Sequence, residues 1–167
     1  MRKGTRMKKF FLFMLTSILL LSGCSKNVNN PYEIAKGTST LSYYDTEDSI
    51  NIDGFNVVEN NLQNYQDKNN NILVNDDGII RCMTITDTAV KTYKGISVGD
   101  SVDRIEDAFD YESKLNDYYT VLFNGNTEEN LENHNLEDNW IWINYLTDDS
   151  QIIAIQIFDV KYGRVLQ

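Results

Sequence analysis

The chain has 167 residues and carries 25 acidic against 15 basic side chains, which gives a formal net charge of −10 at pH 7. The electric field of such a charge repels polyanions. This excludes nucleic acids, anionic lipid headgroups and anionic wall polymers as binding partners. Only two cysteines are present, Cys24 and Cys82, too few for a fold stapled by several disulfides.

The N-terminal segment has the composition of a secretory signal peptide. Residues 1–9 hold five basic side chains, and residues 10–21 form an apolar run that is followed by small residues. The run spans 12 residues, whereas a membrane-spanning helix needs about 20. We therefore expect residues 1–23 to be a signal peptide. An uncleaved signal anchor, or cleavage at another position, is the alternative.

The residues Leu21-Ser22-Gly23-Cys24 resemble the lipobox of bacterial lipoproteins. The resemblance implies that the Cys24 sulfur carries diacylglycerol and that the chain is cleaved between Gly23 and Cys24. Two or more acyl chains hold a protein stably on a bilayer, so the expected location is the extracytoplasmic face of the cell membrane. The mature chain would keep 144 residues, with 10 basic and 25 acidic side chains.

The mature chain divides into a tether and a β-rich body. Residues 24–40 contain few apolar side chains and are typical of a flexible tether with one helical turn around residues 32–36. Beyond them, period-2 alternation predicts strands at residues 50–57, 72–75, 79–86, 118–123, 140–146 and 152–158. One apolar face of this sheet is expected to pack on a helix or a second layer.

Two predicted hairpins are alike. Asn75-Asp76-Asp77-Gly78 joins the second and third strands, and residues 147–151 join the last two in the same way. The hairpins align without gaps at an offset of 72 residues, with five identities over residues 73–87. This suggests an internal duplication, with a degenerate first half at residues 41–94 and a second half at 95–167. Independent use of the same turn chemistry is the alternative.

A short helix is predicted at residues 101–109, where Asp100 or Ser101 can cap the N-terminus and the apolar side chains form one stripe. The preceding Gly95-x-x-x-Gly99-Asp100 turn, together with the paired aromatic strands that follow, is similar to the β-lactamase-inhibitor-like fold and to the small lipoproteins of the outer-membrane-protein assembly machinery. The resemblance covers residues 92–159 and implies tandem units that bind other proteins. We therefore expect an α+β fold of short helices packed on a mainly antiparallel sheet, in two related helix-plus-hairpin halves.

The sequence contains no group of residues typical of catalysis. The sole histidine, His134, lies in a polar stretch at 128–139, where a solvated side chain is expected rather than a member of a nucleophile pair. No Cys/His cluster has zinc spacing, and no Gly-rich loop has phosphate-binding form. Cys82 lies in a predicted strand and is expected to be a buried structural thiol. We therefore expect neither an enzyme nor a bound cofactor or metal.

Calcium binding is the alternative. The run Asp67-Lys68-Asn69-Asn70-Asn71 begins like an EF-hand loop, but Ile72 and Gly78 stand where that loop needs Gly and Glu. Acidic side chains could also gather around a cation, although a solvated acidic loop is the simpler interpretation; they are Glu128, Glu129, Glu132, Glu137 and Asp138. The alternative function is therefore a calcium-dependent envelope protein or a hydrolase that uses these carboxylates.

Aromatic side chains of the second half form the candidate binding surface: Tyr118, Tyr119, Trp140 and Trp142. On the strand at residues 140–146, the isoleucines alternate with the tryptophans, so isoleucines in the core would place one or both tryptophans on the outer face. Cover by residues 124–139 or by the N-terminal half is the alternative. The sequence thus predicts a lipid-anchored, non-catalytic protein-binding module at the cell envelope, with an envelope or extracellular protein as its partner.

Overall fold

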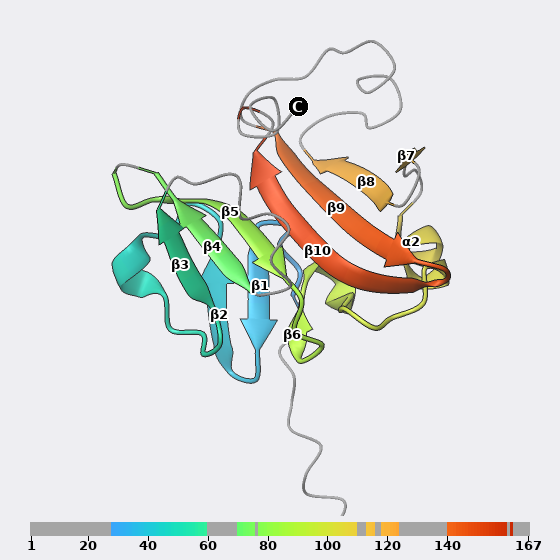
Figure 1. The fold of residues 1–167 in the computed structure, drawn as a ribbon, viewed down its shortest axis with the longest axis horizontal. Coiled ribbons are helices and arrows are strands. Elements are labelled where there is room, and N and C mark those ends of the chain that lie inside the picture. The colour runs from blue at the N-terminus through green and yellow to red at the C-terminus, as the bar shows by residue number, and fades with distance from the viewer. Residues whose placement is uncertain are drawn as a thin grey trace, which may run out of the picture.

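The structure, a computed structural model, describes residues 28–59, 70–75, 77–109, 113–115, 118–123, 140–159 and 161. These residues form two β-sheets (Figure 1). The smaller sheet has the strand order β2-β1-β6, with β1 at Glu33–Lys36, β2 at Ser39–Ser42 and β6 at Val90–Lys91. Both of its strand pairings are antiparallel.

The larger sheet has the strand order β3-β4-β5-β10-β9-β8-β7. Its strands are β3 (Asn56–Glu59), β4 (Asn71–Val74), β5 (Ile80–Ile85), β7 (Ser113–Leu115), β8 (Tyr118–Phe123), β9 (Ile141–Asp148) and β10 (Gln151–Asp159). Only β3 and β4 pair in parallel; the other pairings are antiparallel. The helical elements are α2 (Asp103–Ala108) and the 3₁₀ turns η1 (Glu47–Ser49) and η3 (Tyr93–Gly95).

The predicted α+β fold class is wrong, because the described part of the chain is mostly β. Its longest helix, α2, has six residues and lies near the end of the β9–β10 hairpin (Figure 1), where its buried Ile105 belongs to the core. The core on the apolar face of the large sheet is shared with the small sheet, through Ile34, Leu41 and Val90, and with α2, through Ile105, so a β layer takes part of the place expected for helices. None of the helices in the described ranges is long and apolar enough to cross a bilayer.

The predicted tether at residues 24–40 is wrong from residue 28 onward. Val28 is buried, and its carbonyl oxygen accepts a hydrogen bond from Lys94 N at 3.1 Å. In β1, Ile34 and Ala35 are buried as well, although charged residues flank them and hid the strand signal. Gly37, at φ 62°, makes the turn between β1 and β2. The folded body therefore already includes Val28, four residues after Cys24.

Five of the six predicted strands are confirmed, at β4, β5, β8, β9 and β10. The strand expected at residues 50–57 is wrong over most of its length, because β3 begins only at Asn56. A turn at Asp53 and Gly54 interrupts it, and Gly54 has a φ of 88°, which β-strands do not contain. The helix predicted at residues 101–109 is confirmed as α2.

The core lies between the two sheets and draws on both ends of the chain. Ile34 and Leu41 of the small sheet are buried with Ile72, Ile143 and Ile157 of the large one. The isoleucines of β9 face this core, as the alternation predicted, and Tyr145 lies fully buried beside them. A single apolar layer therefore joins segments that are more than a hundred residues apart in the chain.

The two similar hairpins lie side by side at the centre of the large sheet. Their second strands, β5 and β10, pair antiparallel, and Thr84 lies opposite Gln156, the residue 72 positions later. Each hairpin has a bulge at an equivalent position, Arg81 in β5 and Ile153 in β10. The first strand of each hairpin, β4 or β9, matches the other better at an offset of 73, because the turn after β4 is one residue longer than the turn after β9. The gap-free alignment therefore needs a one-residue gap in this turn.

The helix starts of the two halves share one hydrogen-bond pattern. In the first, Ser42 N donates to Asp45 Oδ2 (2.6 Å), Ile80 N to Asp45 O (2.9 Å) and Tyr44 N to Ile80 O (3.4 Å). In the second, Ser97 N donates to Asp100 Oδ2 (2.9 Å), Ile152 N to Asp100 O (2.9 Å) and Gly99 N to Ile152 O (2.8 Å). Tyr44-Asp45 thus takes the place of Gly99-Asp100, a helix start that the sequence comparison had missed.

This pattern favours a different boundary between the halves. The prediction divided the chain at residue 94. However, β1 and Leu41 precede the first helix start, and β6 and Ile96 precede the second one at equivalent positions. The related units therefore meet in the connection between β5 and β6, within residues 86–89. The symmetry ends at the flanks, because β3 is parallel to β4 whereas β8 is antiparallel to β9.

Candidate functional site

The predicted tryptophan surface is wrong. Trp140 and Trp142 are each only 8% exposed. Trp142 lies on the face of the large sheet opposite the main core, where Leu122 and Phe158 are its cross-strand neighbours. Its ring centroid is 5.7 Å from that of Phe158, and Cys82 continues the row across β5. This row of the reverse face is therefore closed to solvent, and the tryptophans pack instead of binding.

A row of uncharged polar side chains runs beside this apolar row. Thr84, Gln156, Asn144 and Thr120 are successive cross-strand partners from β5 to β8. Thr120 is fully buried, and its hydroxyl oxygen is 2.9 Å from Asn144 Oδ1. These contacts join neighbouring strands, and their burial leaves little surface for a ligand.

Tyr119 supports the fold rather than a binding surface. Its side chain is 4% exposed, and its hydroxyl donates to Glu106 Oε1 at 3.3 Å, which fastens α2 to β8. Tyr118 belongs to β8, but its side chain lies outside the described part of the structure. Cys24, His134 and the acidic side chains of residues 128–138 lie outside the described residues as well. Cys82 is buried, which confirms that prediction.

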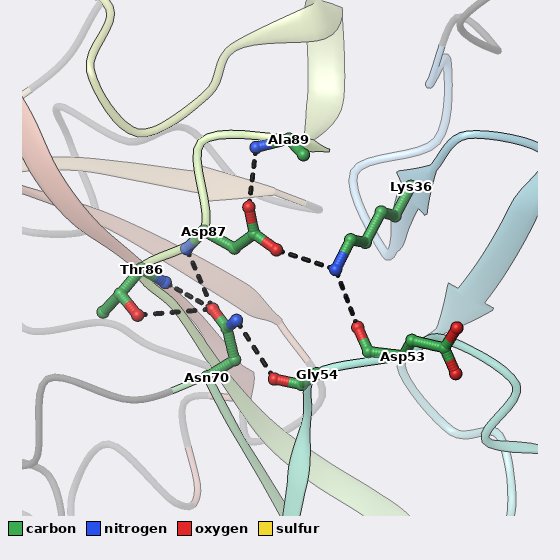
Figure 2. A network of polar contacts seen from close by, with 7 residues as sticks. All are labelled: Lys36, Asp53, Gly54, Asn70, Thr86, Asp87 and Ala89. Carbon is green, nitrogen blue, oxygen red and sulfur yellow. Dashed lines mark hydrogen bonds and ion pairs between the residues drawn. The ribbon is translucent and has the colours of Figure 1, made fainter.

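Asn70, from the candidate calcium loop, is committed to the protein's own backbone (Figure 2). Its Oδ1 accepts hydrogen bonds from Thr86 N at 2.7 Å and Asp87 N at 3.0 Å, and its Nδ2 donates to Gly54 O at 3.2 Å. Residues 67–69 lie outside the described residues. Since both side-chain polar atoms of Asn70 are used internally, this residue is not presented as a metal ligand.

The same network contains an ion pair between Lys36 and Asp87 at 2.8 Å (Figure 2). Lys36 Nζ also donates to Asp53 O at 2.9 Å, and Ala89 N donates to Asp87 Oδ1 at 2.8 Å. The hydrogen bond from Lys36, followed by that from Ala89 N, lowers the pKa of the Asp87 carboxyl. The network fastens the connection between the two halves to the loop before β3, which is a structural role.

A second polar cluster lies where β5 and β10 meet the first helix start. The Tyr43 hydroxyl donates to Asp159 Oδ2 at 2.5 Å, and Arg81 Nη1 lies 3.7 Å from the same oxygen. Tyr43 and Asp159 are both 3% exposed. Burial raises the pKa of Tyr43 far above its ordinary value, and Asp159 raises it further, whereas Arg81 lowers it. The phenol therefore keeps its proton at any physiological pH.

Tyr44 brings this cluster to the surface. Its side chain is 47% exposed, and its ring meets Tyr43 edge-on with centroids 4.3 Å apart. The Arg81 guanidinium carbon lies 5.2 Å from the centre of the Tyr44 ring. Burial, then the charge of Asp159, raises the pKa of Tyr44, against a lowering by Arg81. The Tyr44 ring is thus held at the surface by the polar side chains beneath it.

This cluster is suited to recognition more than to proton transfer. The Tyr43 hydroxyl and the Asp159 carboxylate are bonded to each other and closed to solvent. Across the described ranges, no three His, Cys, Asp or Glu side chains lie close enough to hold a metal ion. Tyrosine and arginine are the residues enriched at the centres of protein–protein interfaces. We take Tyr44 and the residues that support it, Tyr43, Arg81 and Asp159, as the candidate site.

Sequence reasoning missed this site because Tyr43 and Asp159 are 116 positions apart. One signal could have found it. Aligning residues 42–50 with residues 97–105 gives four identities over nine positions, at Ser42, Asp45, Asp48 and Ile50. In that alignment a tyrosine stands opposite Gly99, a substitution that a turn does not favour.

Comparison of the chain with protein-family models, curated proteins and solved structures gives no match.

Proposed function

We propose that this chain is a bacterial lipoprotein, held by a lipidated Cys24 on the extracytoplasmic face of the cell membrane. Its β body is a non-catalytic module that binds an envelope or extracellular protein. The basic, apolar and small-residue order of residues 1–23, followed by Cys24, supports the anchor. Lipidation makes a peripheral membrane protein of an otherwise acidic body.

The observation that carries the binding part is the position of Tyr44. Among the side chains that the structure describes, it is the most exposed aromatic one, and its ring contacts Tyr43 and Arg81. A ring already fixed in place loses little conformational freedom when a partner covers it. Rigid aromatic anchors of this kind dominate the binding energy of many protein interfaces.

The short connection to Cys24 supports a position of the folded body close to the bilayer. Val28 is already packed into the body, so four residue steps separate it from the lipidated position. A fully extended chain covers at most about 14 Å over that distance. The partner is therefore expected at or close to the membrane surface.

The anchor is tested by expressing the chain, tagged at Gln167, in a lipoprotein-processing bacterium beside the Cys24→Ser variant. We expect the wild type in the membrane fraction, with a mature N-terminus at Cys24 that carries the mass of diacylglycerol. The variant should leave that fraction. Equal fractionation of the two proteins, with an unmodified N-terminus, would contradict the anchor.

The binding function is tested in the same cells with a membrane-impermeant amine cross-linker. We expect a covalent complex between the anchored chain and an envelope protein, identified by mass spectrometry. The Cys24→Ser variant is the matched control, because it keeps the folded body but loses its place at the membrane. Absence of any protein complex with the wild type would contradict the binding function.

A further inference from the structure

We propose that Tyr44 is the centre of the interaction surface and that it takes a positively charged segment of the partner protein. This inference rests on the proposed function and specifies the chemistry of the partner. The two equivalent helix starts of the molecule can be compared with each other, residue by residue.

Both turns need a left-handed backbone at the same position. Gly99 has a φ of 90° in the second half, and Tyr44 has a φ of 76° in the first. The surrounding hydrogen bonds are equivalent, so the turn imposes this conformation on either residue. Glycine adopts it without a steric penalty, whereas a side chain with a Cβ does not. The first half therefore keeps a tyrosine at a position where it costs stability.

Folding accounts for only part of that tyrosine, because nearly half of its side chain faces solvent. The contacts with Tyr43 and Arg81 fix the direction of the ring without burying it. At the equivalent place in the second half, Gly99 has no side chain, and the bulge residue opposite is Ile153 instead of Arg81. The aromatic surface is thus a feature of one half alone, as expected for a binding site rather than a turn requirement.

The charge around the ring selects the partner. Glu47 and Asp48 are exposed on η1, which directly follows the Tyr44 turn, and residues 42–50 contain no basic side chain. Arg81, the cation that contacts the ring, is already paired with Asp159. A lysine or arginine of the partner can contact the open part of the ring and pair with these carboxylates, whereas an acidic segment would be repelled.

The test places the photo-reactive amino acid p-benzoylphenylalanine at position 44 of the full, membrane-anchored chain in living cells. The matched control carries it at position 149, because Asp149 is also exposed and left-handed, with a φ of 53°. We expect position 44 to cross-link a protein segment of net positive charge, and position 149 not to do so. In chains left otherwise unmodified, Tyr44→Gly should reduce amine cross-linking of that same partner at least about fivefold, and Tyr44→Phe should retain it.

Cross-linking from position 44 to lipid, to a second copy of this chain, or to an acidic or uncharged segment would overturn the inference. If the amine cross-linker captures a partner that position 44 does not reach and Tyr44→Gly still binds, the inference fails and the proposed function stands. If neither reagent captures a protein, both fail. Membrane levels of each variant, measured in parallel, establish that a loss of cross-linking is not a loss of folded protein.

Discussion

At the scale of single residues, one left-handed backbone position occurs twice in the molecule and holds a different residue each time. The same turn is closed by Gly99 in one half and by Tyr44 in the other, and both have positive φ. A left-handed residue with a Cβ costs roughly 1–2 kcal/mol. That cost is a property of the backbone and can be measured without knowing the partner.

We predict that Tyr44→Gly unfolds at a higher urea concentration than Tyr44→Ala. Both variants lose the ring contacts, but only glycine relieves the left-handed strain, which should favour it by about 1 kcal/mol. Gly99→Ala is the reciprocal control and should lose about 1 kcal/mol. A Cβ at Gly99 would meet only Thr88 Cγ2 at 3.6 Å, an ordinary contact, so the loss would report the backbone. Equal stability of the two position-44 variants would contradict the strain argument.

A second residue-scale prediction concerns acid pH. Lys36 holds the pKa of Asp87 below its ordinary value of 3.8, so the pair stabilises the fold above that pH. This contribution is lost as the pH falls through the lowered pKa, because the unfolded state then binds the proton first. Lys36→Met should therefore cost about 0.2–1 kcal/mol near pH 7, and this deficit should shrink below pH 3.8.

Urea unfolding from pH 7 to pH 2 measures the deficit of Lys36→Met. Asp87→Asn is the matched control, since it removes the same titrating group and should flatten the same acid slope. A deficit that stays constant down to pH 2 would show that the methionine disturbs packing, and not that the ion pair is lost.

At the scale of elements, the large sheet is buried on both faces over its centre. Ile143 and Ile157 face the main core, while Trp142, Phe158 and Cys82 form an equally buried row on the reverse face. A strand with an apolar face and an aromatic face was expected to expose the aromatic one. Here both faces of the strand are buried, so its tryptophans contribute to stability.

We predict that Trp142→Ala destabilises the protein by about 3–5 kcal/mol, the usual cost of truncating a buried aromatic side chain. Trp142→Phe should cost less, because it keeps a ring against Phe158 and removes a buried Nε1 that has no hydrogen-bond partner among the described residues. Thermal and urea unfolding check both values. A loss below about 1 kcal/mol for Trp142→Ala would instead indicate an exposed ring.

At the scale of the whole molecule, the two related halves share one core. β5 and β10 pair along the line between them, and Ile85 and Ile157, equivalent by the offset of 72, are both fully buried. The Lys36–Asp87 network also joins β1 to the connection between the halves (Figure 2). Neither half is expected to fold alone, because each would expose the central edge of its sheet.

We predict a single cooperative unfolding transition. Ile85→Ala and Ile157→Ala should each cost about 2–5 kcal/mol, by similar amounts, because their surroundings are related by the two-fold symmetry. Both tryptophans belong to the second half, so fluorescence reports that half while far-ultraviolet circular dichroism reports all strands. Ile85→Ala should move both midpoints together. A fluorescence midpoint that stays at the wild-type value would show that the halves unfold separately.

The sequence by itself determined what depends on neighbouring residues. Period-2 alternation located β5, β8, β9 and β10, and turn chemistry located the two central hairpins. The Leu21–Cys24 motif predicts the anchor, because the resemblance to a lipobox rests on four adjacent residues. Each of these signals is complete within a few residues of chain, and so none of them needs the fold.

Tertiary structure decided what depends on distant partners. Whether Trp142 is covered, whether residues 33–42 form a sheet or a tether, and whether the second layer is helix or strand all depend on contacts made far along the chain. The candidate site is the clearest case, since Tyr44 is oriented by Arg81 and, through Tyr43, by Asp159 at the other end of the protein. Local propensity carries no information about such pairings; only the packing of the two sheets brings them together.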